Sequence, residues 1–276
     1  MSNPYLPRIG PSIGGVLPGL PQRAGTIESD PSGPPVQAIV LRATGGSRQT
    51  FITPSWATRA RVTALGRGGQ GRGGANGPTI GSDAPGGGGA GLAATLIEDI
   101  PPGTSVDVLF GTATVVNFLN YQLSGGNGGD ATSTAGGVGG VGSGGAINFN
   151  GGAGTTFGAG GGAAGRGGNG ETGGGDVVVS VGGNSGPGDQ YSTGGGAGGA
   201  QWNDTLNRVG AGGISRVDTC LLGAALIGKS TTIGGGPNNP AAANCNGGDG
   251  GGGSGGSKNA SISNIPGAAL VLIELW

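Results

Sequence analysis

Histidine is missing from this 276-residue sequence, and charged side chains are scarce. The absence of histidine removes the commonest general base and metal ligand, and it excludes histidine-based hydrolysis. Only 10% of the residues are charged, and the formal net charge is −1. This balance leaves no electrostatic footprint for nucleic acid or for an anionic membrane. We therefore expect no nucleic acid among the partners and no membrane insertion.

Long apolar runs and cysteines are also scarce. No stretch approaches the roughly 20 apolar residues of a membrane span, and residues 1–5 lack the basic-then-apolar pattern of a secretion signal. We expect the chain to be made and folded in a cytoplasm. That compartment favours two buried thiols over a disulfide between Cys220 and Cys245, although their pairing stays open.

Aromatic residues make up 4% of the chain and methionine occurs once, so a conventional hydrophobic core would be underfilled. Glycine instead supplies 74 residues, far above its usual share of about 7%. Low charge and 34% apolar residues favour an ordered chain over a disordered one. A collagen helix is excluded, because only 17 prolines occur and no long Gly-X-Y register exists.

The glycines recur at steps of three in residues 136–145, 68–77 and 247–256. Neither an α-helix nor a strand has this period, whereas a polyproline-II-type helix does. Its backbone groups point sideways and can pair with neighbouring helices. The predicted fold is therefore mainly β plus a polyglycine-II helix bundle, with a small antiparallel β-element packed on a glycine-rich lattice and little or no α-helix. Val138 and Val141 should face outward or towards a β-layer, and Gly139→Val should disrupt the packing.

Four regions follow from the pattern. Residues 1–35 contain eight prolines and are predicted to be an extended attachment arm that docks on a partner or on the particle, the alternative being a flexible leader. Residues 36–123 form a strand-rich element with the first glycine run. Residues 124–265 form the polyglycine-II bundle with binding loops. Residues 266–276 form a closing strand, which should be central or well covered because it is so apolar.

Alternating and β-branched residues predict the strands of the second region. We expect Leu92–Ile100 to form a hairpin with Val106–Phe110 across the turn at residues 101–104. In Arg59–Leu65, alternate residues should face opposite sides, with Ala60, Val62 and Ala64 together. The other predicted strands are Val36–Ala43, Gln49–Thr53 and Val115–Leu123, the last as one β-like or bulged stretch.

One segment resembles a nucleotide-binding motif. Residues 223–230 match the phosphate-loop pattern G-x-x-x-x-G-K-S, but the glycine-rich residues that follow cannot form the required helix. Such matches arise easily by chance in this composition. An ATPase acting through Lys229 remains an alternative that titration with ATP would test. We expect no enzyme activity, no catalytic residue, no cofactor and no metal site.

Short polar and aromatic inserts interrupt the glycine runs, and loops on a rigid scaffold are where binding usually occurs. Their composition is typical of antibody-like binding loops. Alternatively, the aromatic residues fill the bundle or pack between subunits. The predicted contact residues are Asn148, Phe149, Asn150, Asp189, Gln190, Tyr191, Gln201, Trp202, Asn203 and Asp204.

The order of these elements resembles phage glycine-rich tail-fibre domains. Thr50-Phe51 with Pro54, Arg61–Gly66 leading into glycine, and the strand at Gly91–Ile100 resemble their opening. Pro266–Trp276 is similar to their closing strand. The loops on a polyglycine bundle also resemble the tip adhesins of T-even-like phages. Residues 1–35 lie outside the resemblance.

This resemblance implies a homotrimeric virion protein of the tail fibre or tip. It would bind a host surface receptor (a protein, pilus or polysaccharide) and attach to other tail or baseplate proteins through residues 1–35. The alternatives are a structural baseplate or tail-connector protein without receptor binding, and an ice-binding polyglycine protein, which a thermal-hysteresis assay would detect.

Overall fold

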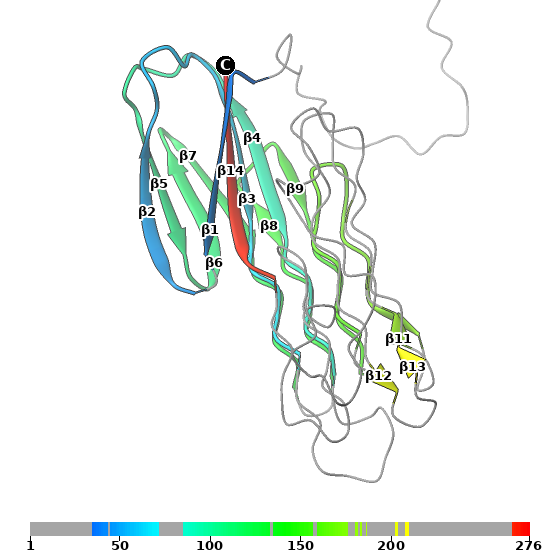
Figure 1. Cartoon of the computed structure of the whole chain (residues 1–276). Helices are drawn as coiled ribbons and strands as arrows, with labels where there is room; N and C mark the ends of the chain where they lie inside the picture. Colours follow the sequence, from blue (N-terminus) through cyan, green and yellow to red (C-terminus); the bar gives the residue numbers. More distant parts are fainter. Residues whose placement is uncertain are drawn as a thin grey trace, which may run out of the picture.

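The structure is a computed structural model in which no helix occurs among the described residues and the strands form two five-stranded antiparallel sheets (Figure 1). The prediction of little or no α-helix is confirmed for this part of the chain. The described residues are 35–43, 45–71, 85–132, 135–156, 159–175, 180–181, 183, 186, 202–203, 208–209 and 267–276.

The first sheet has the order β1-β14-β3-β4-β9. All its neighbouring strands are antiparallel. The bounds are β1 (Gln37–Ala43), β3 (Ala60–Leu65), β4 (Leu92–Ile97), β9 (Ile147–Phe149) and β14 (Ala269–Leu275).

The second sheet has the order β2-β5-β6-β7-β8. Strands β5 to β8 form a meander, in which each strand pairs with the next one in sequence, and β2 pairs with β5. Its bounds are β2 (Ser47–Ile52), β5 (Ser105–Phe110), β6 (Ala113–Phe118), β7 (Tyr121–Gly126) and β8 (Gly142–Ser143). Two isolated pairs lie outside both sheets: β10 (Gly174–Gly175) with β11 (Ser180–Val181), and β12 (Trp202–Asn203) with β13 (Arg208–Val209).

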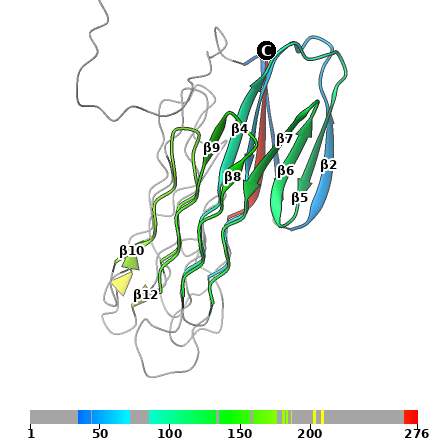
Figure 2. The ribbon, with the colours of Figure 1, turned by 180° about the vertical axis from the view of Figure 1, so that it is seen from behind.

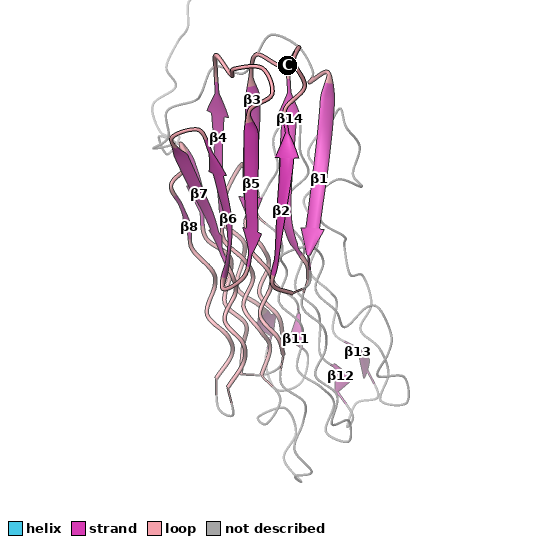
Figure 3. Ribbon diagram, turned by 90° about the vertical axis from the view of Figure 1, so that its left-hand side faces the viewer, coloured by secondary structure: helices cyan, strands magenta, loops and turns pink. Residues whose placement is uncertain are grey.

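The two sheets pack face to face around one apolar core, as Figure 3 shows. In β5 and β6 every second residue is buried, which is the alternation expected of a sheet with one covered face. Val106, Val108, Phe110, Val116 and Phe118 from these strands are at most 1% exposed. They meet side chains from β3, β4 and β14 of the other sheet.

The last strand, β14, is central and fully covered, as its composition predicts. It pairs with β1 on one side and β3 on the other, and all seven of its residues are buried. Its inward residues join the core between the sheets, while Leu270 and Leu272 join a second apolar cluster on the opposite face. Burial on both faces explains the nearly continuous apolar run Ala269–Leu275.

The second apolar cluster covers the outer face of the first sheet. Leu65, Leu92 and Leu270 pack there against Ala163 and Ala164, which belong to a glycine-rich run far from them in sequence. Phe149 and Ile147 of β9 pack against the edge of this cluster. The glycine-rich run thus contributes alanine rather than large side chains to this cluster. The small alanine side chain lets the backbone of the run approach the sheet closely.

Two details of the strand predictions are wrong. Leu92–Ile97 does not form a hairpin with Ser105–Phe110; β4 pairs with β3 and β9, whereas β5 pairs with β2 and β6. The chain at residues 98–104 therefore crosses from one sheet to the other. Val115–Leu123 is two strands, β6 and β7, separated by a two-residue turn in which Leu119 has φ of 53°.

The alternation predicted for Arg59–Leu65 is confirmed, because Ala60, Val62 and Ala64 of β3 all join the core between the sheets. All six residues of β3 are nevertheless buried, so its opposite face is covered as well. Arg61 and Thr63 lie on the face that the glycine-rich runs cover, where they are 3% and 0% exposed. A polar residue within a strand is normally taken to face solvent. Here the polar side chains lie beneath a second layer of the fold.

Candidate contact surface on the glycine-rich runs

The glycine-rich runs continue from the same end of the two sheets and lie beside one another (Figures 1 and 2). The run 85–91, which precedes β4, is buried throughout. Its backbone hydrogen-bonds to five other described runs: 66–69, 126–129, 137–140, 152–155 and 161–164. These partners are far apart in sequence, so the runs form one hydrogen-bonded body.

The hydrogen bonds between runs recur every third residue. Gly137 and Gly140 donate to the carbonyls of Gly86 and Gly89, both at 2.8–2.9 Å. Gly88 and Gly91 donate to the carbonyls of Gly129 and Gly126 at 3.0 and 2.9 Å. The spacing of the bonds matches the spacing of the glycines in the sequence.

Glycine is required in these runs because the backbones touch. A Cβ atom on Gly86, Gly88 or Gly89 would overlap the carbonyl group of Ala159, Val138 or Gly162 respectively. A Cβ on Gly139 would likewise overlap the carbonyl oxygen of Gly151. The close approach lets backbone groups pair across runs, and buried backbone groups need such partners.

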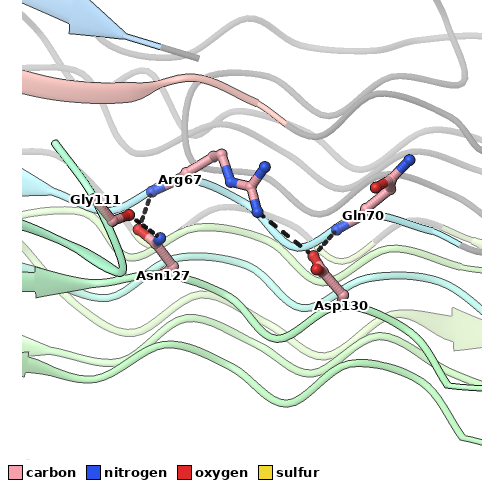
Figure 4. Close-up of polar contacts among 5 residues, drawn as sticks. All are labelled: Arg67, Gln70, Gly111, Asn127 and Asp130. Atoms are coloured by element: carbon pink, nitrogen blue, oxygen red, sulfur yellow. Dashed lines mark hydrogen bonds and ion pairs between the residues drawn. The ribbon is translucent and has the colours of Figure 1, made fainter. Parts of the chain in front are cut away.

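At one edge of this body, side-chain oxygens accept hydrogen bonds from backbone amides, in the role that carbonyl groups have between the other runs (Figure 4). The amide of Arg67 donates to Oδ1 of Asn127 at 2.9 Å, and the amide of Gln70 donates to Oδ1 of Asp130 at 2.7 Å. Asn127 also donates through Nδ2 to the carbonyl of Gly111 at 2.8 Å, which links the run to the β5–β6 turn. Both the donors and the acceptors are three residues apart.

Val138 and Val141 lie on an outer surface of the runs and are 71% and 60% exposed, as predicted. Gly137 and Gly140 beside them are buried. The period of three therefore gives run 136–142 one inner and one outer side. The outer side is where contact residues would have to lie.

The predicted contact residues Asn148, Phe149 and Asn150 follow this run, in and after β9. Asn148 is exposed, but its side chain is bonded to Gly145: Nδ2 donates to the carbonyl at 2.6 Å and Oδ1 accepts from the amide at 3.1 Å. Phe149 is half-buried against the second apolar cluster. These contacts favour structural roles for both side chains.

Asn150 differs from its two neighbours because its side chain is exposed while its backbone is anchored. Its amide donates to Oδ1 of Asn169 at 2.8 Å, and its carbonyl accepts from the amide of Gly170 at 2.9 Å. The structure thus brings Asn150 and Asn169 together at the surface. Asn150 is the predicted contact residue of this insert that is best presented to a partner.

Of the remaining predicted contact residues, Trp202 and Asn203 form β12 and pair in register with Val209 and Arg208 of β13. This pairing places them on a short two-stranded element. Asp189, Gln190, Tyr191, Gln201 and Asp204 lie outside the described residues, as do the arm 1–34, both cysteines and the phosphate-loop-like motif.

Sequence reasoning missed two polar features of the structure. The pair Asn127 and Asp130 had a detectable signal, because both interrupt a glycine run at its own spacing of three. The second is the ion pair between Arg166 and Glu274, in which both side chains are fully buried. Its signal was Glu274, a charge inside an otherwise apolar strand.

Within the described residues, no group of three or more acidic or cysteine side chains is arranged to hold a metal ion. The same residues contain no helix with the length and hydropathy of a membrane span. No protein-family model and no curated protein matches the chain.

Proposed function

We propose that this chain is a receptor-binding protein of a phage tail fibre or tail tip, located in the virion, and that its glycine-rich runs are polyglycine-II helices. The observation that supports the proposal best is the network of backbone hydrogen bonds around run 85–91. Its step of three is the repeat of a polyproline-II-type helix. Such a network holds the runs rigidly and fixes the ends of the segments that connect them.

The proposed activity is adhesion without chemistry. Loops held on a rigid scaffold bind with little loss of conformational entropy, because they are ordered before the partner arrives. The inserts that contain Asn150, Tyr191 and Trp202 would contact a protein, pilus or polysaccharide on the bacterial surface. Residues 1–35 would contact other tail or baseplate proteins, and the assembly would be a homotrimer, as in the fibres that the sequence resembles.

The test is direct binding of the fluorescently labelled full chain to a panel of bacterial strains, measured by flow cytometry. We expect binding to a subset of strains, reduced at least several-fold by Tyr191→Ala or Trp202→Ala with an unchanged melting temperature. Val138→Ser is the matched control, because Val138 is exposed on a run rather than in a loop. If Val138→Ser weakens binding and the loop variants do not, the proposed contact residues are wrong.

A second candidate function is a structural virion part without receptor binding. The contacts of Asn148 with Gly145 and of Phe149 with the second apolar cluster favour it, because they commit part of the proposed loop surface to the fold. This candidate predicts that the protein binds no strain and co-assembles with tail proteins.

A further inference from the structure

Both sides of the two-sheet sandwich have a three-residue link between edge strands, residues 144–146 between β8 and β9 and residues 44–46 between β1 and β2. On the closed side β8 and β9 contact each other. On the open side, β1 and β2 are the outer strands of the two sheets among the described strands. They are consecutive, and Figure 3 shows them at the same side of the sandwich.

The apolar core reaches the surface at this open side. Ile39 and Leu41 of β1 and Phe51 of β2 pack against the core but remain partly exposed. Their neighbours deeper in the core, such as Val62 and Ile273, have no exposed surface. Side chains that pack against the core are therefore accessible along β1 and β2.

Among the described strands, none pairs with the outer edge of β1, and this edge is suited to accept another strand. All seven of its residues pair with β14, so every second backbone group along the other edge points away from the sheet. The strand contains no proline, and Arg42 is its only charge. Protected edges normally carry proline or several charges, because a long apolar edge pairs readily with an added strand.

The chain itself supplies a segment at this place. Residues 1–34 join the fold at the start of β1, where the amide of Val36 donates to the carbonyl of Leu275 at 2.8 Å. A strand partner needs backbone amides, which proline lacks. Residues 12–17 (Ser-Ile-Gly-Gly-Val-Leu) are the longest uncharged stretch in residues 1–34 that is free of proline.

We propose that residues 12–17 add to the outer edge of β1 in the same chain. The 18 residues between this segment and Val36 reach roughly 60 Å when extended, and β1 is only about 23 Å long. The connection is therefore long enough to return along β1. A tethered segment has an effective concentration near the millimolar range, which favours the same chain over a second copy.

In this arrangement Ile13 and Leu17 lie on one face of the added strand, since residues alternate along a strand. That face covers Ile39, Leu41 and Phe51 and closes the open side of the core. The inference does not depend on the proposed receptor binding. It also leaves residues 1–11 for contacts with other proteins.

The test measures hydrogen exchange of the β1 amides by NMR in the full chain and two variants. We expect the amides that point away from β14 to be protected in the unaltered chain. Val16→Pro, which removes an amide from the segment, should accelerate their exchange about tenfold or more without affecting β3 and β14. Gly19→Pro is the control, because it adds a proline between Pro18 and Pro21, outside the segment.

Light scattering on the same samples shows whether the added strand belongs to the same chain or to a second copy. Outward amides that stay protected when dilution lowers the molar mass to that of a monomer support pairing within the chain. Outward amides that lose their protection as the molar mass falls assign the edge to a second copy and overturn the proposal. Unprotected amides in the unaltered chain, or equal effects of Val16→Pro and Gly19→Pro, also overturn it.

Discussion

Arg166 and Glu274 form an ion pair that joins the glycine-rich layer to the final strand, and neither side chain has exposed surface. Arg166 lies in the turn between Gly165 and Gly168, which are bridged to each other. Its Nη2 donates to Oε1 of Glu274 at 3.2 Å, and its Nη1 donates to Oγ1 of Thr63 at 3.3 Å. Residues separated by more than a hundred positions are thus fixed at one point over the first sheet.

The first prediction is that Arg166→Met strongly destabilises the protein. This change removes the ion-pair partner of the buried Glu274 carboxylate, and breaking a buried pair typically costs about 3–5 kcal/mol. The double variant Arg166→Met with Glu274→Leu should recover much of this loss, because an apolar pair needs no compensating charge. Urea denaturation measures the free energy of unfolding of each variant.

The control for the buried pair is the ion pair between Arg48 and Asp107 on the outer face of the second sheet. Arg48 Nε lies 2.8 Å from Asp107 Oδ1, but the Arg48 side chain is 71% exposed. Arg48→Met should therefore change stability little. Equal effects of Arg166→Met and Arg48→Met would contradict a dominant role for burial.

The second prediction concerns the pH dependence of the Arg48–Asp107 pair. Hydrogen bonding and attraction from Arg48 hold the pKa of Asp107 below its usual value. Because this pKa is lowered by folding, the pair contributes stability above the unfolded pKa of Asp, near 3.9, and loses it as the pH falls through the folded pKa. NMR titration should show the Asp107 pKa rising towards 3.9 in Arg48→Met. An unchanged pKa would mean that Arg48 is not its cause.

The third prediction is that a glycine substitution destabilises the protein where two runs are in close contact but not in an open turn. In Gly139→Val the new side chain meets the Gly151 carbonyl, so we expect a loss of roughly 1–3 kcal/mol or more. In Gly111→Val no atom lies within 4 Å of the new Cβ, and φ is not positive. Thermal melts of both variants measure the difference. If Gly139→Val melts like Gly111→Val, the runs are not packed backbone to backbone.

The strands and the covered final strand were predictable because each depends on local pattern. Val106–Phe110 and Ala268–Trp276 have the composition of a half-buried and a fully buried strand. The partner of each strand was not predictable in the same way. Ser105–Phe110 has the same alternation whether it pairs with β4 or β6, and the local turn at residues 101–104 suggested the wrong neighbour.

The contact residues were harder to predict than the strands. Asn148, Phe149 and Asn150 have the composition of a binding loop, but composition does not tell which side chains the fold itself uses. Asn148 bonds to a glycine three residues earlier, and Phe149 meets side chains distant in sequence. The period of three, by contrast, predicted that Val138 and Val141 face either outward or towards a β-layer, and both face outward.

The last prediction tests whether the runs need side chains at their edge. In Asn127→Ala the amide of Arg67 loses its acceptor at a partly buried site, and the Gly111 carbonyl loses its donor. Leaving such groups unpaired costs about 1–3 kcal/mol. Asn127→Asp keeps the acceptor for Arg67 and removes only the donor, so it should lose less. Hydrogen exchange at the Arg67 amide distinguishes the two: it should accelerate in Asn127→Ala and stay slow in Asn127→Asp. If both variants accelerate it equally, the amide is protected by packing of the runs rather than by Asn127, and the edge needs no side-chain acceptor.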